Sequence, residues 1–271
     1  MKLISDHTYP QNVREDAWEK LKQFTDARIA LGRTGCSIPT HAMLEFQFAH
    51  AQARDAVYQQ LNVEQLAEQL KLIGLESQFV TSQAEDKKEY LKRPDLGRLL
   101  NQESVAKLKE YQIQQTDHYD VCIVVGDGLS ALAIEENAFK MIEALKSEIT
   151  KLDLKLAPIV IASGSRVALG DQVAEILNCK MLIMMIGERP GLSSPDSMGI
   201  YYTYAAKTGS LDSQRNCISN IRPAGLSVYI ATQRLVSLMT KSNTLGYSGV
   251  NLKDEHEVPI LETEHSLKKL F

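Results

Sequence analysis

An acidic and a basic residue stand together directly after a long apolar run. The run Met181-Leu-Ile-Met-Met-Ile186 is followed by Gly187-Glu188-Arg189-Pro190-Gly191. Six consecutive apolar residues predict a strand that is buried on both faces. The glycines and the proline then predict a turn at its carboxyl end. Ligands of open α/β sheets bind outside the carboxyl ends of such strands, so Glu188 is a candidate ligand-binding residue.

Two further loops carry polar or reactive groups. Gly164-Ser165-Arg166-Val167 follows a predicted strand, and Asn216–Ile221 precedes the last predicted helix. If these loops meet Glu188 at one edge of a sheet, they offer an apolar side chain, a carboxylate, guanidinium groups, a thiol and backbone groups. This mixture suits a large, amide-rich, partly apolar ligand with one phosphate. The loops hold no adjacent nucleophile and base and no metal-ligand set, so we predict no catalytic residue and no metal site in this chain.

The elements that position these loops alternate between strand and helix. The predicted strands span residues 120–125, 158–162, 181–186 and 199–204, and the predicted helices span 130–151, 171–177 and 226–241. This order predicts an α/β, Rossmann-like fold with a mostly parallel sheet and flanking helices. We expect a mainly helical N-terminal region at 1–118, the Rossmann-like domain at 119–242 and a C-terminal tail at 243–271.

Composition excludes several classes of function. The chain has 271 residues and a net charge of -4, which argues against a general affinity for nucleic acid. No apolar run approaches the roughly 20 residues that span a bilayer, so we expect no membrane partner. The four cysteines show no Cys-x-x-Cys spacing, which favours a reducing, cytoplasmic location.

A glycine-rich segment suggests a competing function. Gly126-Asp127-Gly128-Leu129-Ser130-Ala131 fits the G-x-G-x-x-G/A pattern that binds dinucleotides between a strand and a helix. Such a site also needs an acidic residue at the end of the next strand. Here that strand ends Ile161-Ala162-Ser163-Gly164, which contains no acidic residue. We therefore interpret the segment as a tight turn with Ser130 as the helix N-cap.

Five motifs recur in an order and spacing known from one family. They are Leu31-Gly-Arg-Thr-Gly35, Arg93-Pro-Asp-Leu-Gly-Arg98, Asp127-Gly-Leu-Ser130, Gly187-Glu-Arg-Pro-Gly-Leu192 and Asn216-Cys-Ile-Ser-Asn-Ile221. From residue 13 to residue 242 the chain resembles the small (light) subunit of ethanolamine ammonia-lyase. The resemblance implies a carbon–nitrogen lyase that is active only with its large subunit, which holds the substrate. It also implies conversion of ethanolamine to acetaldehyde and ammonia by a radical mechanism that depends on adenosylcobalamin.

The resemblance also implies specific contacts and partners. The family's cobalamin contacts in the small subunit correspond to Val167, Glu188 and Cys217, and charge makes Arg166 a further candidate for the cofactor phosphate. The family keeps the cofactor's own benzimidazole on cobalt (base-on). In agreement, the nearest match to the cobalt-binding pattern D-x-H-x-x-G, Asp254–Pro259, has proline instead of glycine. The expected partners are the large subunit, cobalamin and a reactivating chaperone, and a bacterial microcompartment is a second expected location.

Two alternatives make different predictions. A nucleotide-binding α/β oxidoreductase, based on Gly126-Asp127-Gly128, would bind NAD as an isolated chain. A purely structural assembly subunit would leave cobalamin affinity unchanged when Glu188 is replaced.

Overall fold

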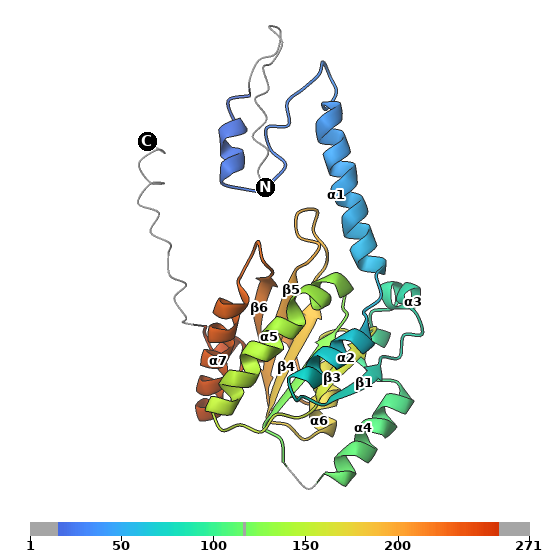
Figure 1. Ribbon diagram of the computed structural model, residues 1–271, viewed down its shortest axis with the longest axis vertical. Coiled ribbons are helices and arrows are strands. Elements are labelled where there is room, and N and C mark those ends of the chain that lie inside the picture. Colours follow the sequence, from blue (N-terminus) through green and yellow to red (C-terminus); the bar gives the residue numbers. More distant parts are fainter. Residues whose placement is uncertain (1–15, 116–117, 255–271) are drawn as a thin grey trace. The chain divides into compact units, whose positions relative to one another are not determined.

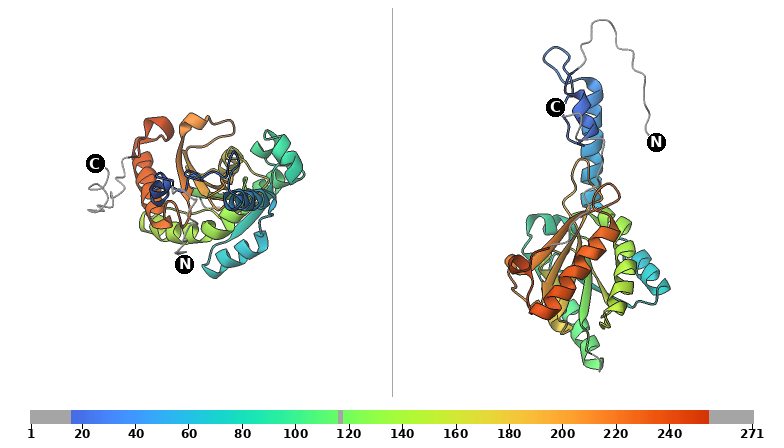
Figure 2. Two further views of the ribbon diagram at one scale, coloured as in Figure 1. Left: turned by 90° about the horizontal axis from the view of Figure 1, so that it is seen from above. Right: turned by 90° about the vertical axis from the view of Figure 1, so that its left-hand side faces the viewer.

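The computed structural model describes residues 16–115 and 118–254 and has an α/β architecture, with helices on both faces of a six-stranded sheet (Figures 1 and 2). The strands are β1 (Ser77–Thr81), β2 (Val121–Gly126), β3 (Ile159–Ser163), β4 (Met181–Gly187), β5 (Met198–Tyr204) and β6 (Arg215–Ile221). The helices are α1 (Thr40–Tyr58), α2 (Val63–Leu72), α3 (Lys87–Lys92), α4 (Gln102–Gln114), α5 (Ala131–Lys151), α6 (Leu169–Ile176) and α7 (Val228–Leu245). Short 3₁₀ helices span Glu19–Gln23, Leu96–Arg98, Asp212–Gln214 and Gly249–Asn251. The chain divides into two compact units between Gln52 and Ala53.

The sheet is mixed, so a mostly parallel, Rossmann-like sheet is not confirmed. Its strand order is β1-β3-β2-β4-β5-β6. The first four strands pair in parallel, whereas β5 runs antiparallel to β4 and β6 runs antiparallel to β5. A parallel neighbour needs a crossover of about a dozen residues or more. Only residues 188–197 separate β4 from β5, so the chain turns back directly.

The segment Asn216–Ile221, expected to be a loop, lies in the edge strand β6, so that expectation was wrong. The buried residues of β6 are Arg215, Ile218 and Ile221, at every third position. Arg215 is buried on one face of the sheet, beside Asp171 of α6. Ile218 and Ile221 are both buried on the other face, because Met198 pairs with Ile221 and Ile200 with Ile218, which places two residues of β6 opposite one residue of β5. Such a β-bulge removes the period of two by which strands are recognised in a sequence.

The sheet also begins earlier in the chain than the change of sequence pattern near residue 119. Strand β1 lies within the region expected to be mainly helical. It pairs in parallel with β3, from Ser77 opposite Ile159 to Thr81 opposite Ser163. The unit that contains the sheet starts at Ala53.

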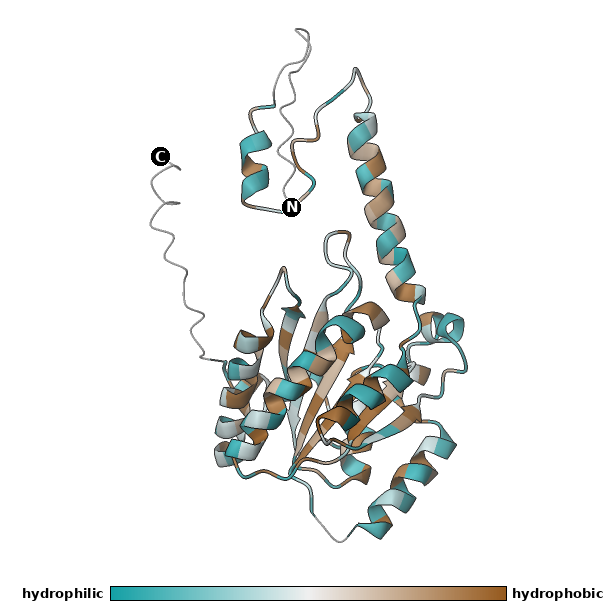
Figure 3. Ribbon diagram, viewed as in Figure 1, coloured by the Kyte–Doolittle hydropathy of each residue, from teal (hydrophilic) through white to brown (hydrophobic). Residues whose placement is uncertain are grey.

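The core fills both faces of the sheet. Side chains of α2, α5 and α7 pack with alternate residues of the strands on one face, and side chains of α4 and α6 pack on the other. The central strands are strongly apolar, as Figure 3 shows, and all seven residues of β4 are buried. Helix α5 begins after Ser130, whose hydroxyl accepts a hydrogen bond from the Ala133 amide, as expected for an N-cap. Among the described residues, no helix combines the length and apolarity needed to cross a membrane.

Candidate functional site

Glu188 lies directly after β4, and donors from two other segments hold its carboxylate. The Ser197 hydroxyl donates to Oε2 at 2.5 Å, and the Ser219 hydroxyl donates to Oε1 at 2.5 Å. The backbone amide of Asn220 donates to Oε2 at 3.2 Å. These groups, rather than the adjacent Arg189, fix the position of the carboxylate.

The β-bulge in β6 shapes this arrangement. Ser219 and Asn220 together face Gly199 of β5, and Asn220 has a φ of 61°, a conformation that asparagine tolerates better than most residues. A Cβ atom at Gly199 would lie 2.7 Å from Oε1 of Glu188, so a glycine is needed for the carboxylate to fit. Bulges often re-aim side chains, and this one brings the Ser219 hydroxyl to Glu188.

Cys217 lies on β6 opposite Tyr201 of β5, near Glu188. Its side chain is exposed, whereas Tyr201 is half-buried. Burial raises the pKa of Tyr201 to about 12, with further contributions from Cys217 and Glu188. Desolvation raises the pKa of the Cys217 thiol, although its hydrogen bond with Tyr201 opposes this shift. Both groups are therefore protonated at neutral pH, and a protonated thiol is a packing or hydrogen-bonding group rather than a nucleophile.

Val167 and Arg166 lie in the turn between β3 and α6. Val167 is half-buried and packs against the core under α6. The guanidinium carbon of Arg166 lies 4.2 Å from the centroid of the buried Tyr90 ring, and the Tyr90 hydroxyl donates to the Ser165 carbonyl at 3.0 Å. The Arg166 Nε atom is buried and has no hydrogen-bond partner within the described parts of the chain. The guanidinium is therefore held in place by stacking on Tyr90.

A second cation lies beside Arg166. The Lys87 ammonium lies 4.9 Å from the centroid of the Tyr90 ring and 3.7 Å from the Asp127 carboxylate, and it donates to the Gly128 carbonyl at 2.9 Å. Burial lowers the pKa of Lys87; Asp127 opposes this effect and the Arg166 charge adds to it. Lys87 pairs with Asp127, and Arg166 adds a second positive charge over the same Tyr90 ring, so this corner at the carboxyl ends of β2 and β3 favours an anion.

The expected site residues border one stretch of sheet surface. Helices α4 and α6 pack over β1, β2 and β4, whereas Cys217 on β6 is exposed. Val167 and Tyr201 both pack against the core cluster on this face, and Glu188 contacts Ser219 of β6. The ends of β3 and β4 are separated by β2, so Val167 and Glu188 follow strands about 10 Å apart. That distance suits a single large ligand better than direct contact between the two residues.

Sequence reasoning did not single out Ser197, Ser219, Gly199 or Tyr90. Ser197 and Ser219 lie 9 and 31 residues from Glu188 along the chain. Only the pairing of β5 with β6 brings the two serines together at Glu188, and no local sequence pattern indicates this pairing.

The glycine-rich turn after β2 is explained by packing. The Leu129 amide donates to the Gly187 carbonyl at 3.0 Å, and a Cβ atom at Gly128 would lie 2.3 Å from that carbonyl oxygen. The Ser130 hydroxyl donates to the Pro195 carbonyl at 2.7 Å. The glycines therefore allow close contact with the end of β4, which agrees with the tight-turn interpretation and adds no support for a dinucleotide site.

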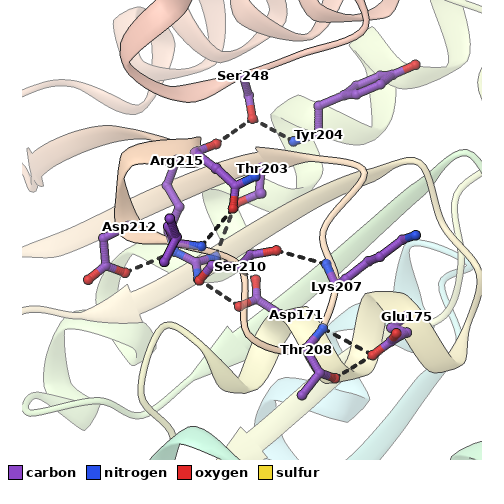
Figure 4. Close-up of polar contacts among 12 residues, drawn as sticks. Asp171, Glu175, Thr203, Tyr204, Lys207, Thr208, Ser210, Asp212, Arg215 and Ser248 are labelled. Carbon is purple, nitrogen blue, oxygen red and sulfur yellow. Dashed lines mark hydrogen bonds and ion pairs between the residues drawn. The ribbon is translucent and has the colours of Figure 1, made fainter.

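A buried ion pair connects α6 to the start of β6 (Figure 4). The two terminal nitrogens of Arg215 donate to Asp171 at 2.5 and 2.7 Å. Its remaining donors contact Thr203 at 3.3 Å, the Ser210 carbonyl at 2.8 Å and Asp212 at 3.2 Å. All five N–H groups of the guanidinium therefore have an acceptor. Burial raises the pKa of the Asp171 carboxyl, and the hydrogen bonds from Arg215 offset part of that effect.

Comparison with known proteins places these observations in a family. Residues 15–253 match the family model described as "Ethanolamine ammonia-lyase light chain (EutC)". Ethanolamine ammonia-lyase small subunits from Pseudomonas putida and Pseudomonas aeruginosa are 49% and 46% identical over 96% of this chain, covering 95% and 96% of those proteins. The small subunit of Pseudomonas fluorescens is 48% identical over 94% of this chain and 92% of its own length. The chain therefore belongs to the family of ethanolamine ammonia-lyase small subunits, which are parts of a carbon–nitrogen lyase that also has a large subunit.

Proposed function

We propose that this chain forms one wall of a cobalamin site and that the large subunit holds the substrate. The cofactor supplies the radical chemistry that converts ethanolamine to acetaldehyde and ammonia. The residues of this chain bind and orient it. The observation that carries the proposal is the incomplete cover of the sheet near Val167, Glu188 and Cys217, where Cys217 is exposed and Tyr201 is half-buried. This surface combines an apolar side chain, a fixed carboxylate and a neutral thiol.

The donors and acceptors of the site fit a corrin. A corrin carries apolar ring edges and several primary amides, and its nucleotide tail carries a ribose and one phosphate. Val167 offers an apolar contact and Glu188 an acceptor for N–H or O–H groups. Base-on binding belongs to the proposal, because the D-x-H-x-x-G pattern at Asp254–Pro259 is incomplete. His256 of that pattern lies outside the described residues.

Co-expression with the large subunit tests this function. We expect ethanolamine deaminase activity only when both subunits and adenosylcobalamin are present. In the assembled enzyme, Glu188→Ala is expected to raise the cobalamin Kd about 10- to 100-fold, because a hydrogen bond to a charged group contributes about 1.5–3 kcal/mol. Spectroscopic titration with cobalamin measures this change.

The exposed Glu68 on α2 provides a matched control. Glu68→Ala removes the same side chain away from the site and should leave the Kd unchanged. An unchanged Kd for Glu188→Ala in an intact complex would contradict the proposal and favour a purely structural subunit. NAD binding by the isolated chain would instead favour the oxidoreductase alternative.

The corner formed by Arg166, Lys87 and Tyr90 is proposed to receive the cofactor phosphate. Arg166 is stacked on Tyr90, and its orientation is set before any ligand binds. We expect Arg166→Ala to weaken cobalamin binding about tenfold, in line with a charge-assisted hydrogen bond. Cobinamide lacks the nucleotide tail and its phosphate, so its affinity should not change. Equal losses for both ligands would contradict a phosphate contact.

The N-terminal part of α1 is proposed to dock on the large subunit. Met43, Leu44, Phe46 and Phe48 are exposed there. At 3.6 residues per turn they spread over about half of the helix circumference. A helix with so wide an apolar surface is normally covered by protein, and the large subunit is the partner that the family provides.

A further inference from the structure

The hydrogen bonds around Glu188 leave little of its carboxylate unused. A carboxylate offers about four lone-pair positions. Donors from Ser197 and Asn220 occupy Oε2, and the donor from Ser219 occupies one position on Oε1. A Cβ atom at Gly199 would lie 2.7 Å from Oε1, so Oε1 occupies space that only a glycine leaves open. One lone-pair position, on Oε1, therefore has no donor among the described residues.

Ser197 and Ser219 restrict which ligand groups can bind at Glu188. Each hydroxyl has one proton and gives it to Glu188, so its remaining lone pairs can only accept. The carboxylate is also acceptor-only when ionised. Glu188, Ser197 and Ser219 therefore present acceptors and no donor.

We propose that Ser219, with Ser197, is a positioning residue that makes Glu188 a single-acceptor site for a hydrogen-bond donor of the cobalamin. The donor is either a primary amide N–H of the corrin or a ribose O–H, since the two share this chemistry. A ligand group that can only accept is rejected. This inference rests on the proposed function, because it assumes that Glu188 faces the cofactor.

A double-mutant cycle in the assembled enzyme tests the role of Ser219. Ser219 is exposed, so Ser219→Ala should fold. We expect it to raise the cobalamin Kd about fivefold to tenfold, because Glu188 loses one of the bonds that orient it. In a Glu188→Ala background the same change should have no further effect, and Ser219→Thr should retain affinity by keeping the hydroxyl. Ser193→Ala, at an exposed serine in the loop before β5, is the matched control.

Titration with cobinamide identifies the donor. Cobinamide keeps the corrin amides but lacks the ribose. If Ser219→Ala weakens both ligands equally, the donor is an amide; if it weakens only cobalamin, the donor is the ribose hydroxyl. Either result supports the proposal. It is overturned if Ser219→Ala changes neither Kd while Glu188→Ala raises the cobalamin Kd, or if the effects of the two substitutions multiply. An unchanged Kd for Glu188→Ala contradicts the proposed function itself, and the two failures are thus distinguishable.

Discussion

Arg215→Ala is expected to lower the free energy of unfolding by about 3–5 kcal/mol, the cost of breaking a buried ion pair by removing one partner. Asp171 is fully buried and would lose both hydrogen bonds from the guanidinium. The Ser210 carbonyl and the Thr203 hydroxyl would also lose a donor. Urea unfolding of the purified chain, followed by far-ultraviolet circular dichroism, measures the change.

The double variant Asp171→Leu/Arg215→Met is the informative control. It removes both charges and fills a similar volume, and such replacements of buried ion pairs are often neutral or stabilising. We therefore expect the double variant to be more stable than either Asp171→Leu or Arg215→Ala. A loss below about 1 kcal/mol for Arg215→Ala, the range of exposed ion pairs, would show that the pair is not buried in solution.

Phe46→Glu on α1 is expected to reduce recovery of the large subunit in co-purification by about tenfold or more, because a buried aromatic anchor in an interface contributes about 2 kcal/mol or more. The substitution places a charge within the exposed apolar surface formed by Met43, Leu44, Phe46 and Phe48. The amount of large subunit retained by a tagged small subunit measures the effect.

Gln114→Glu is the matched control, since it adds the same charge to an exposed polar position at the end of α4, outside α1. It should leave co-purification unchanged, because the apolar surface of α1 stays intact. Full recovery with Phe46→Glu would mean that this apolar surface does not form the subunit contact.

Strands β2, β3, β4 and β5 could be predicted from sequence because they carry local signals, whereas β1 lies in a region expected to be mainly helical. Strand β4 is a run of apolar residues followed by glycine, and Ser130 marks the start of α5 as an N-cap. The antiparallel strand β6 could not be predicted. In β6 a charged residue, Arg215, is buried and the bulge disrupts alternation, so neither polarity nor period indicated a strand.

The same difference applies to the candidate site. Glu188 could be singled out because it follows a buried strand directly. The groups that hold Glu188 could not, since Ser197 and Ser219 become neighbours only through the register of β5 and β6. Tyr90 likewise gave no signal, because its stacking with Arg166 depends on how α3 packs beside the turn after β3.

The sheet surface beside α6 is covered less completely than the rest of the core, with Cys217 exposed and Tyr201 half-buried. A cofactor bound there would cover this surface and so complete the hydrophobic core, in addition to its role in the reaction. A ligand that binds the folded chain but not the unfolded chain raises the free energy of unfolding, and this increase grows with the logarithm of the ratio of free ligand concentration to Kd. The supply of cobalamin would then determine the lifetime of the folded subunit in the cell, in addition to the catalytic rate of the enzyme.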